Sequence, residues 1–154
     1  MKPKELKMNL IITSESKRVE NYKKNYRILF EIEKYFIEKK FDWIKIEIKG
    51  KLLTGKGNLK IGGKTFPVEI LYSPFFFDSF RRFDLIHIKD TSIKYNKNIH
   101  LYGDLSLCLY HPIIDKEPSE TIPLAKMIPW ISEWCVHYEE WKKYGVWLGK
   151  EIKH

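Results

Sequence analysis

The apolar residues of this chain change their spacing near residue 41, and this change restricts the fold more than any other feature. From Arg18 to Lys40 they recur mainly at intervals of three and four residues, which predicts an amphipathic helix with a basic outer face. The next stretch, FDWIKIEIKGKL, places isoleucine at every second position, which predicts a half-buried strand. A helix followed directly by a strand with one apolar face favours an α+β fold.

Glycine and proline punctuate the chain after this first strand. The segment TFPVEILYS at residues 65–73 predicts another strand, and DLIHIKD at 84–90 predicts a further one. Three glycine-containing stretches predict turns: Gly50, TGKGN at 54–58 and IGGK at 61–64. The stretch PFFFDSFRRF at 74–83 predicts a buried irregular crossover, because proline limits ladder pairing. The predicted arrangement is therefore one helix followed by an antiparallel meander of up to four strands.

A second apolar pattern near the C-terminus predicts another helix. Apolar residues recur from Ile128 to Trp141 at near-helical spacing, and the pattern ends at Gly145. Pro129 fits the first turn of such a helix, where a missing N–H leaves no hydrogen bond unmade. The tryptophans of this helix are expected to pack into the core rather than form a partner-binding face: Trp130, Trp134 and Trp141.

The length and hydropathy of the chain predict a single globular domain. It has 154 residues, of which 44% are hydrophobic, so it can bury an ordinary core. Residues 1–16 are expected to be flexible or loosely packed. The sequence has no run of 18 apolar residues, and its N-terminal apolar patch is too short for a signal peptide. We therefore expect a cytoplasmic protein in which Cys108 and Cys135 are free thiols.

Positive charge is concentrated in the first part of the chain. Residues 1–64 carry 17 Lys and Arg against 8 Asp and Glu, whereas residues 65–154 carry 11 against 12. A basic half fits a lysine-rich solvated surface, an acidic protein partner or nucleic acid. Nucleic acid is the least favoured, because Arg18 and Arg27 are the only arginines there and planar phosphate recognition favours arginine.

The segment NKNIHLYGDLSLCLYHP at residues 96–112 carries the candidate chemistry. Cys108 lies in a short apolar run between a turn and a proline-containing loop, with His100 before it and His111 after it. A cysteine in this position is either a buried structural thiol or a nucleophile, and a nucleophile needs an activating group and an oxyanion stabiliser. We expect the flanking turns to expose the sulfur beside these histidines.

A metal site is a weaker interpretation of some of these residues. Cys108 and His111 are three residues apart, and Cys135 and His137 are two apart, so a zinc site with two Cys and two His ligands can be drawn. However, two ligands at the second spacing point apart on a helix. We expect neither a metal nor another cofactor.

The order of elements and the cysteine segment together resemble the ubiquitin-conjugating enzyme (UBC) fold. In that family an N-terminal helix precedes a four-stranded antiparallel meander, an irregular stretch with the catalytic cysteine, and further helices. Gly103 and the Leu-Cys-Leu tripeptide around Cys108 match the family's turn glycine, displaced by about two residues, and its Ile-Cys-Leu core. The family's His-Pro-Asn triplet reads Asn-Ile-His here and ends at His100, which stands where the family has an asparagine.

The C-terminal half more narrowly resembles bacterial UBC-like proteins of CBASS antiviral operons, which are encoded beside cGAS-like nucleotidyltransferases. The shared features are an Ile-Pro-Trp at residues 128–130 and a Trp/Tyr-rich helix ending in Gly-x-Trp at 145–147. The resemblance implies a thioester between Cys108 and the C-terminal carboxyl of the nucleotidyltransferase, followed by transfer to an amine. A separate activating enzyme is implied as one route, because the chain has no Gly-rich nucleotide-binding motif.

The resemblance also implies roles for other residues. His100 would stabilise the oxyanion or position the loop, and His111 would act as a base or orient the amine. Asp115 and Glu117 would attract that amine, and the first helix would dock the activating enzyme. Two other functions stay open: a noncatalytic UBC-like adaptor that binds the same partners, and a basic nucleic-acid-binding module whose affinity falls with salt.

Overall fold

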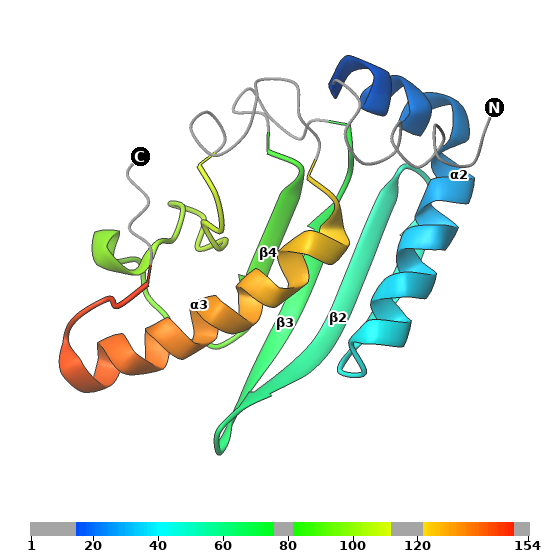
Figure 1. Ribbon diagram of the computed structural model, residues 1–154. Coiled ribbons are helices and arrows are strands. Elements are labelled where there is room, and N and C mark those ends of the chain that lie inside the picture. Colours follow the sequence, from blue (N-terminus) through cyan, green and yellow to red (C-terminus); the bar gives the residue numbers. More distant parts are fainter. Residues whose placement is uncertain (1–14, 76–81, 112–121, 150–154) are drawn as a thin grey trace.

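The protein combines two long helices with one antiparallel sheet, as the computed structural model shows for residues 15–75, 82–111 and 122–149 (Figure 1). Helix α2 (Glu15–Lys40) precedes the strands β1 (Ile44–Lys49), β2 (Leu52–Ile61), β3 (Lys64–Tyr72) and β4 (Asp84–Ile88). A short 3-10 helix, η1 (Lys97–Ile99), and helix α3 (Leu124–Tyr144) follow. The four strands pair in sequence order, so the predicted α+β class and the four-stranded meander are confirmed.

The glycines of the second strand do not form the turn that their sequence predicts. TGKGN lies inside β2, paired with β1 on one side and β3 on the other. A side chain on Gly55 would press on Ile46 at 3.1 Å, and one on Gly57 would lie 2.1 Å from the Trp43 carbonyl. These glycines therefore permit close packing rather than chain reversal. The turns at Gly50 and Gly62 are confirmed, and both residues have the left-handed φ of 60° that favours glycine.

Helix α2 packs along the edge strand β1, and two of its side chains satisfy the backbone N–H and C=O of Ile46. The Glu38 carboxylate accepts the Ile46 N–H at 2.8 Å, and the Lys34 ammonium donates to the Ile46 carbonyl at 2.8 Å. The Ile46 hydrogen bond holds the pKa of Glu38 below its usual value. Because edge strands with free N–H and C=O groups invite aggregation, this pair of side chains protects β1.

The outer face of α2 is less polar than its sequence predicts. The helix starts at Glu15, three residues before the predicted start, and its backbone is non-helical at Asn25. Phe30 and Ile37 are fully buried, as an amphipathic helix requires. Four large apolar side chains are nevertheless exposed: Ile28, Ile32, Tyr35 and Phe36. The basic outer face therefore also carries an apolar stripe, and this part of the prediction is incomplete.

Helix α3 crosses one face of the sheet and begins earlier than predicted (Figure 1). Its first turn contributes the buried residues Leu124 and Met127 to the core, and the Glu33 carboxylate of α2 accepts the Ala125 N–H at 2.8 Å. Pro129 therefore lies inside the helix, and its predicted place in the first turn is wrong. The predicted end is confirmed, since Gly145 has a φ of 74° and its N–H donates to the Trp141 carbonyl.

The tryptophans of α3 pack into the core as predicted. Trp134 is buried, and Trp130 and Trp141 are partly buried against the same cluster. Pro74 and Phe75 follow the end of β3 at Tyr72, but most of the predicted crossover lies outside the described residues. Across residues 15–75, 82–111 and 122–149, no helix is both long and apolar enough to cross a bilayer.

Candidate active site

Cys108 follows a tight hairpin-like loop that its own backbone hydrogen bonds define. Leu101 and Leu107 form an isolated antiparallel bridge, and the Tyr102 N–H donates to the Ser106 carbonyl at 2.9 Å. The Leu105 N–H returns to the Tyr102 carbonyl at 2.9 Å, which closes a turn. Immediately beyond this loop the cysteine's own N–H donates to the His100 carbonyl at 2.9 Å. The position of Cys108 is therefore fixed by backbone geometry.

Two anchors hold this loop against the rest of the fold. The Leu107 N–H donates to the Ile86 carbonyl of β4 at 2.8 Å, so the cysteine segment lies along the sheet. The Trp134 Nε1–H of α3 donates to the Ile99 carbonyl at 2.9 Å and approaches the His100 carbonyl at 3.3 Å. The loop is thus tied to both the sheet and the second helix.

A chain of polar side chains links Arg82 to the loop. The Arg82 Nη2–H donates to the Ser106 hydroxyl at 2.9 Å, and that hydroxyl donates in turn to the Asp104 carboxylate. The Ser106 N–H donates to the same carboxylate oxygen at 2.9 Å. Burial tends to raise the pKa of Asp104, but the Ser106 hydrogen bonds outweigh it, so the pKa lies below its usual value. Asp104 is therefore a stable carboxylate that stiffens the turn.

The side chain of Tyr102 connects this polar chain to the cysteine. Its hydroxyl lies close enough to the Cys108 side chain for the two to interact, and the Arg82 guanidinium lies 3.7 Å from the centre of its ring. Burial first, and the neighbouring Cys108 second, raise the pKa of Tyr102 far above its usual value. The phenol consequently stays protonated and can donate to the sulfur.

Tyr110 contacts the cysteine from the other side. The Cys108 thiol donates to the Tyr110 carbonyl with an Sγ–O distance of 3.7 Å. The Tyr110 hydroxyl donates to the buried Asp84 carboxylate at 2.9 Å and accepts the Phe83 N–H at 3.4 Å. Burial, then Asp84, raise the pKa of this tyrosine as well. The sulfur therefore lies between a phenol donor and a carbonyl acceptor.

The predicted site residues are arranged differently from the expectation. Cys108 is buried, with 2% of its surface exposed, so the prediction that the turns expose the sulfur is wrong. The hydrogen bonds above pull the segment inward against β4 and α3. His100 is also buried, adopts a left-handed φ of 55°, and packs its ring at a tilt against Trp147 with centroids 4.9 Å apart. His111 is half-buried three residues after the cysteine.

A family comparison identifies the protein class to which this arrangement belongs. The profile of the family described as Type II CBASS E2 protein matches residues 33–154. The chain belongs to that family. No curated protein and no solved structure is detectably similar to it. The family places this chain among the E2-like proteins of CBASS antiphage defence.

In this type II CBASS E2 protein, several polar residues around the cysteine were missed by sequence reasoning. Tyr102 and Tyr110 lie six residues before and two after Cys108, so their spacing offered a signal that the sequence interpretation did not use. Arg82 and Asp84 reach the site from the start of β4, and no local pattern connects them with the cysteine. Asp115 and Glu117, proposed to attract the amine, lie outside the described residues.

The zinc arrangement is not assembled in the part of the chain that the structure describes. In those ranges, no group of three or more His, Cys, Asp or Glu side chains is close enough to hold a metal ion. His137 instead pairs with Glu140 at 2.9 Å and contacts Trp147. The Cys135 thiol is fully buried in α3, where burial raises its pKa to about 12.

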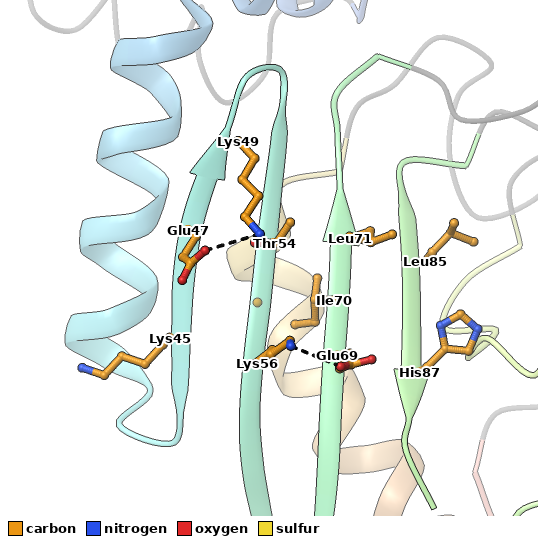
Figure 2. Close-up of a pocket in the computed structure, with 11 residues that line it drawn as sticks. Lys45, Glu47, Lys49, Thr54, Lys56, Glu69, Ile70, Leu71, Leu85 and His87 are labelled. Atoms are coloured by element: carbon orange, nitrogen blue, oxygen red, sulfur yellow. Dashed lines mark ion pairs between the residues drawn. The ribbon is translucent and has the colours of Figure 1, made fainter.

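A separate depression lies on the sheet face opposite α3 (Figure 2). Figure 2 shows charged side chains across it, with ion pairs of 3.6 Å from Lys49 to Glu47 and from Lys56 to Glu69. His87 lines its border, and the His87 Nε2 lies 3.1 Å from the Asp104 carbonyl of the cysteine loop. This face therefore touches the loop but lacks the cysteine.

Proposed function

We propose that this type II CBASS E2 protein has the UBC fold and works as a conjugating enzyme. Cys108 carries an acyl group as a thioester, formed with the C-terminus of a cGAS-like nucleotidyltransferase, and passes it to an amine. The observation that carries the proposal is the built environment of Cys108, whose N–H, sulfur and neighbouring loop are all hydrogen-bonded in a chain of an E2 family. A thiol that only filled space would not need these polar partners.

The proposed chemistry has two balanced steps. In the first, the Cys108 thiolate attacks the carbonyl carbon of an activated acyl group, the C–S bond forms, and the activating group leaves with its electron pair. In the second, a neutral amine attacks the thioester carbonyl, the C–N bond forms, and the sulfur leaves as a thiolate while the amine proton passes to a base. Most of the catalysis is then positioning and stabilisation of charge.

Two histidines take the remaining roles in this proposal. His111, three residues after the nucleophile, receives the amine proton or orients the amine. His100 holds the loop, because its carbonyl accepts the Cys108 N–H and its ring rests on Trp147. An imidazole N–H also can donate to the oxyanion that forms at the thioester carbonyl.

Burial of the sulfur adds a requirement. An acyl carrier must meet a protein tail, yet Cys108 has only 2% of its surface exposed. The residues around the thiol therefore have to move before each acyl transfer. In the proposed reaction, the docked partner supplies the binding energy for that opening.

A docking surface for the activating enzyme is proposed on α2. The exposed stripe of Ile28, Ile32, Tyr35 and Phe36 lies on one helix face, at spacings of four, three and one residues. Lys39 lies at its end, with Nζ 3.4 Å from the Tyr35 hydroxyl. An apolar stripe with a cationic border suits a partner surface that is apolar and acidic.

The test is intact-mass measurement of the protein purified from cells that also express its operon neighbours. A thiol-labile adduct is expected on the wild type, and its mass identifies the donor. Cys108→Ser should either lack the adduct or retain it as an ester that thiol does not cleave. The matched control is Cys135→Ser, which should carry the same labile adduct as the wild type. An adduct that persists unchanged in Cys108→Ala would refute the thioester.

The burial of Cys108 also supports a second function, a noncatalytic adaptor. An adaptor would bind the nucleotidyltransferase without a covalent bond and would need no accessible sulfur. It predicts an unmodified mass with the partner still copurifying, and full antiphage protection from Cys108→Ala. Loss of protection in Cys108→Ala, with partner binding retained, would exclude the adaptor.

A further inference from the structure

Arg82 is a buried cation with unusual partners. Only 5% of its surface is exposed, and buried arginines are normally paired with carboxylates. Its direct partners among the described residues are instead a neutral hydroxyl, that of Ser106, and the face of the Tyr102 ring. Both belong to the hairpin-like loop that precedes Cys108. Among the described residues, the buried guanidinium therefore contacts and holds this loop.

We propose that Arg82 is a positioning residue that holds the Tyr102 phenol against the Cys108 sulfur, so that the phenol donates to the sulfur whenever it carries negative charge. This inference rests on the proposed function, because both acyl-transfer steps place negative charge on that sulfur: once as nucleophile and once as leaving group. A phenol donor stabilises the thiolate in each case. No proton leaves Tyr102 in either step.

The geometry supports this role from two directions. The guanidinium covers the Tyr102 ring at 3.7 Å, which fixes the plane of the ring. The guanidinium itself is fixed by Ser106, whose hydroxyl is oriented by Asp104. The Leu101–Leu107 bridge and the backbone bond from the Tyr102 N–H to the Ser106 carbonyl bring Tyr102 beside the cysteine segment, with its phenol close to the Cys108 side chain. A loose arginine could not align the phenol in this way.

The other titratable groups near the cysteine loop come from several segments. Arg82 lies just before β4 and Asp84 begins it, Tyr102 and Asp104 belong to the loop, and Tyr110 follows the cysteine. His100 precedes the loop, and α3 contributes the neutral indole of Trp134 beneath it. Asp84 and Asp104 oppose a thiolate, so the cation and the phenol are the groups that favour it.

The first experiment measures the pH dependence of Cys108 alkylation by iodoacetamide in a Cys135→Ser background, with peptide mapping. Arg82→Met and Tyr102→Phe should each raise the midpoint by about one pH unit. The double variant should match Tyr102→Phe, because Arg82 acts through Tyr102. Tyr72→Phe is the matched control, a fully buried tyrosine of β3 whose hydroxyl donates to the Ile122 carbonyl, and its midpoint should not move.

The second experiment measures thioester formation by the same variants with the operon neighbours present. Arg82→Met and Tyr102→Phe should slow it about tenfold, and Arg82→Lys should recover part of the loss. Thermal unfolding of each variant separates folding from reactivity. Where Arg82→Met does not fold, Arg82→Lys and Tyr102→Phe carry the test.

The outcomes separate this inference from the proposed function. An unshifted midpoint in a folded Arg82→Met or Arg82→Lys protein, or midpoint shifts that add in the double variant, would overturn the positioning role. Normal thioester formation in all these variants would also overturn it and leave the proposed function intact. A wild type without any Cys108-dependent adduct overturns the proposed function, and the alkylation midpoints still decide whether Arg82 controls the thiol through Tyr102.

Discussion

The two cysteines of this protein are equally buried but lie in different chemical surroundings. Cys108 is 2% exposed and Cys135 is 0% exposed. Cys108 lies among polar groups of an irregular loop, where its thiol donates to the Tyr110 carbonyl and the Tyr102 hydroxyl lies close by. Cys135 lies in the core face of α3, where burial raises its pKa to about 12. Burial alone thus does not separate a structural thiol from a candidate nucleophile, whereas the donors around the sulfur do.

The two regions are also mechanically connected. Trp134 neighbours Cys135 on α3, and its indole N–H holds the backbone that leads into the Cys108 loop. The apolar face of α3 therefore supports the polar loop, which packs against it. Changes to the helix are expected to reach the loop through this side chain and through Trp130, whose ring centroid lies 6.4 Å from that of Tyr110. Changes within the loop should leave the helix intact.

The largest expected difference between the two sites is in adduct formation. Cys108→Ala should abolish every thiol-labile adduct, because no acyl carrier remains. Cys135→Ala should keep full adduct formation and lower the free energy of unfolding by about 1–2 kcal/mol through lost packing. Intact-mass spectra and urea unfolding curves measure the two effects. Equal adduct loss in both variants would show that Cys108 and Cys135 do not differ as nucleophile and structural thiol.

The connection between the regions predicts the next largest effect, at Trp134. Trp134→Ala should lower the free energy of unfolding by about 3–5 kcal/mol, because it leaves a large core cavity. Trp134→Phe keeps a six-membered aromatic ring in the core but leaves the Ile99 carbonyl without its donor. It should lower the free energy of unfolding by about 1–2 kcal/mol. Trp134→Phe should also speed alkylation of Cys108, because the loop loses its anchor.

Trp141→Phe is the control for that effect. Trp141 is partly buried on the same helix, where it stacks on Tyr138 with ring centroids 6.1 Å apart. Its substitution should cost less than Trp134→Phe in urea unfolding and leave the Cys108 alkylation rate unchanged. Faster alkylation in Trp141→Phe would show that any loosening of α3 opens the loop, and that Trp134 is not a specific anchor.

His100 allows the loop geometry to be tested without touching the sulfur. His100→Asn should fold well and keep adduct formation, because asparagine tolerates the left-handed φ of 55° and offers an amide donor. His100→Ala should slow adduct formation about tenfold or more, through loss of the donor and of the Trp147 contact. The rates come from timed mass spectra. Equal rates in both variants would mean that the His100 side chain has no role in adduct formation and that only its backbone carbonyl matters.

The raised pKa of Cys135 predicts a smaller effect on stability at high pH. In the unfolded chain a thiol loses its proton near pH ~8.5, whereas native Cys135 keeps it up to about pH 12. Between these values the unfolded chain binds fewer protons, so the free energy of unfolding falls as pH rises. The fall should be shallower in Cys135→Ala, as urea unfolding at about pH 8 and about pH 10 would show. The buried tyrosines contribute equally to both proteins, so parallel curves would contradict the assignment.

Much of the fold followed from the sequence because its signals are periodic and local. The change from helical to alternating spacing near Phe41 correctly gave α2 and β1, and Gly145 gave the end of α3. The turn predicted at TGKGN was wrong because glycine occurs at close backbone contacts as well as in turns. Only the folded structure, in which the Trp43 carbonyl lies against Gly57, shows that close packing is the reason for glycine here. The prediction that Pro129 lies in the first turn was wrong because the residues before it are held in a helical turn by their burial in the core, which no local pattern indicates.

The site was less predictable than the fold. Cys108, His100 and His111 were found because they are close in sequence, but nothing local shows that the sulfur is buried. Arg82 contacts the loop across 20 to 24 residues, a pairing that requires the sheet to be assembled. The predicted turn at Gly103 is confirmed, since the Leu105 N–H closes it on the Tyr102 carbonyl, but no local pattern indicates that Leu105 adopts the left-handed conformation.

Leu105 predicts the smallest effect and the one most specific to the loop. It is 37% exposed with a φ of 69°, a conformation that costs an L-residue about 1–2 kcal/mol and costs glycine nothing. Leu105→Gly should therefore raise the free energy of unfolding by up to about 1 kcal/mol, after the added entropy of the unfolded chain is subtracted. Leu71→Gly is the control, a leucine 40% exposed in β3, and it should lower stability by about 1 kcal/mol. If both substitutions destabilise the protein equally, the Leu105 side chain is holding the loop closed, and the strain at this turn is offset by its packing beside the candidate nucleophile.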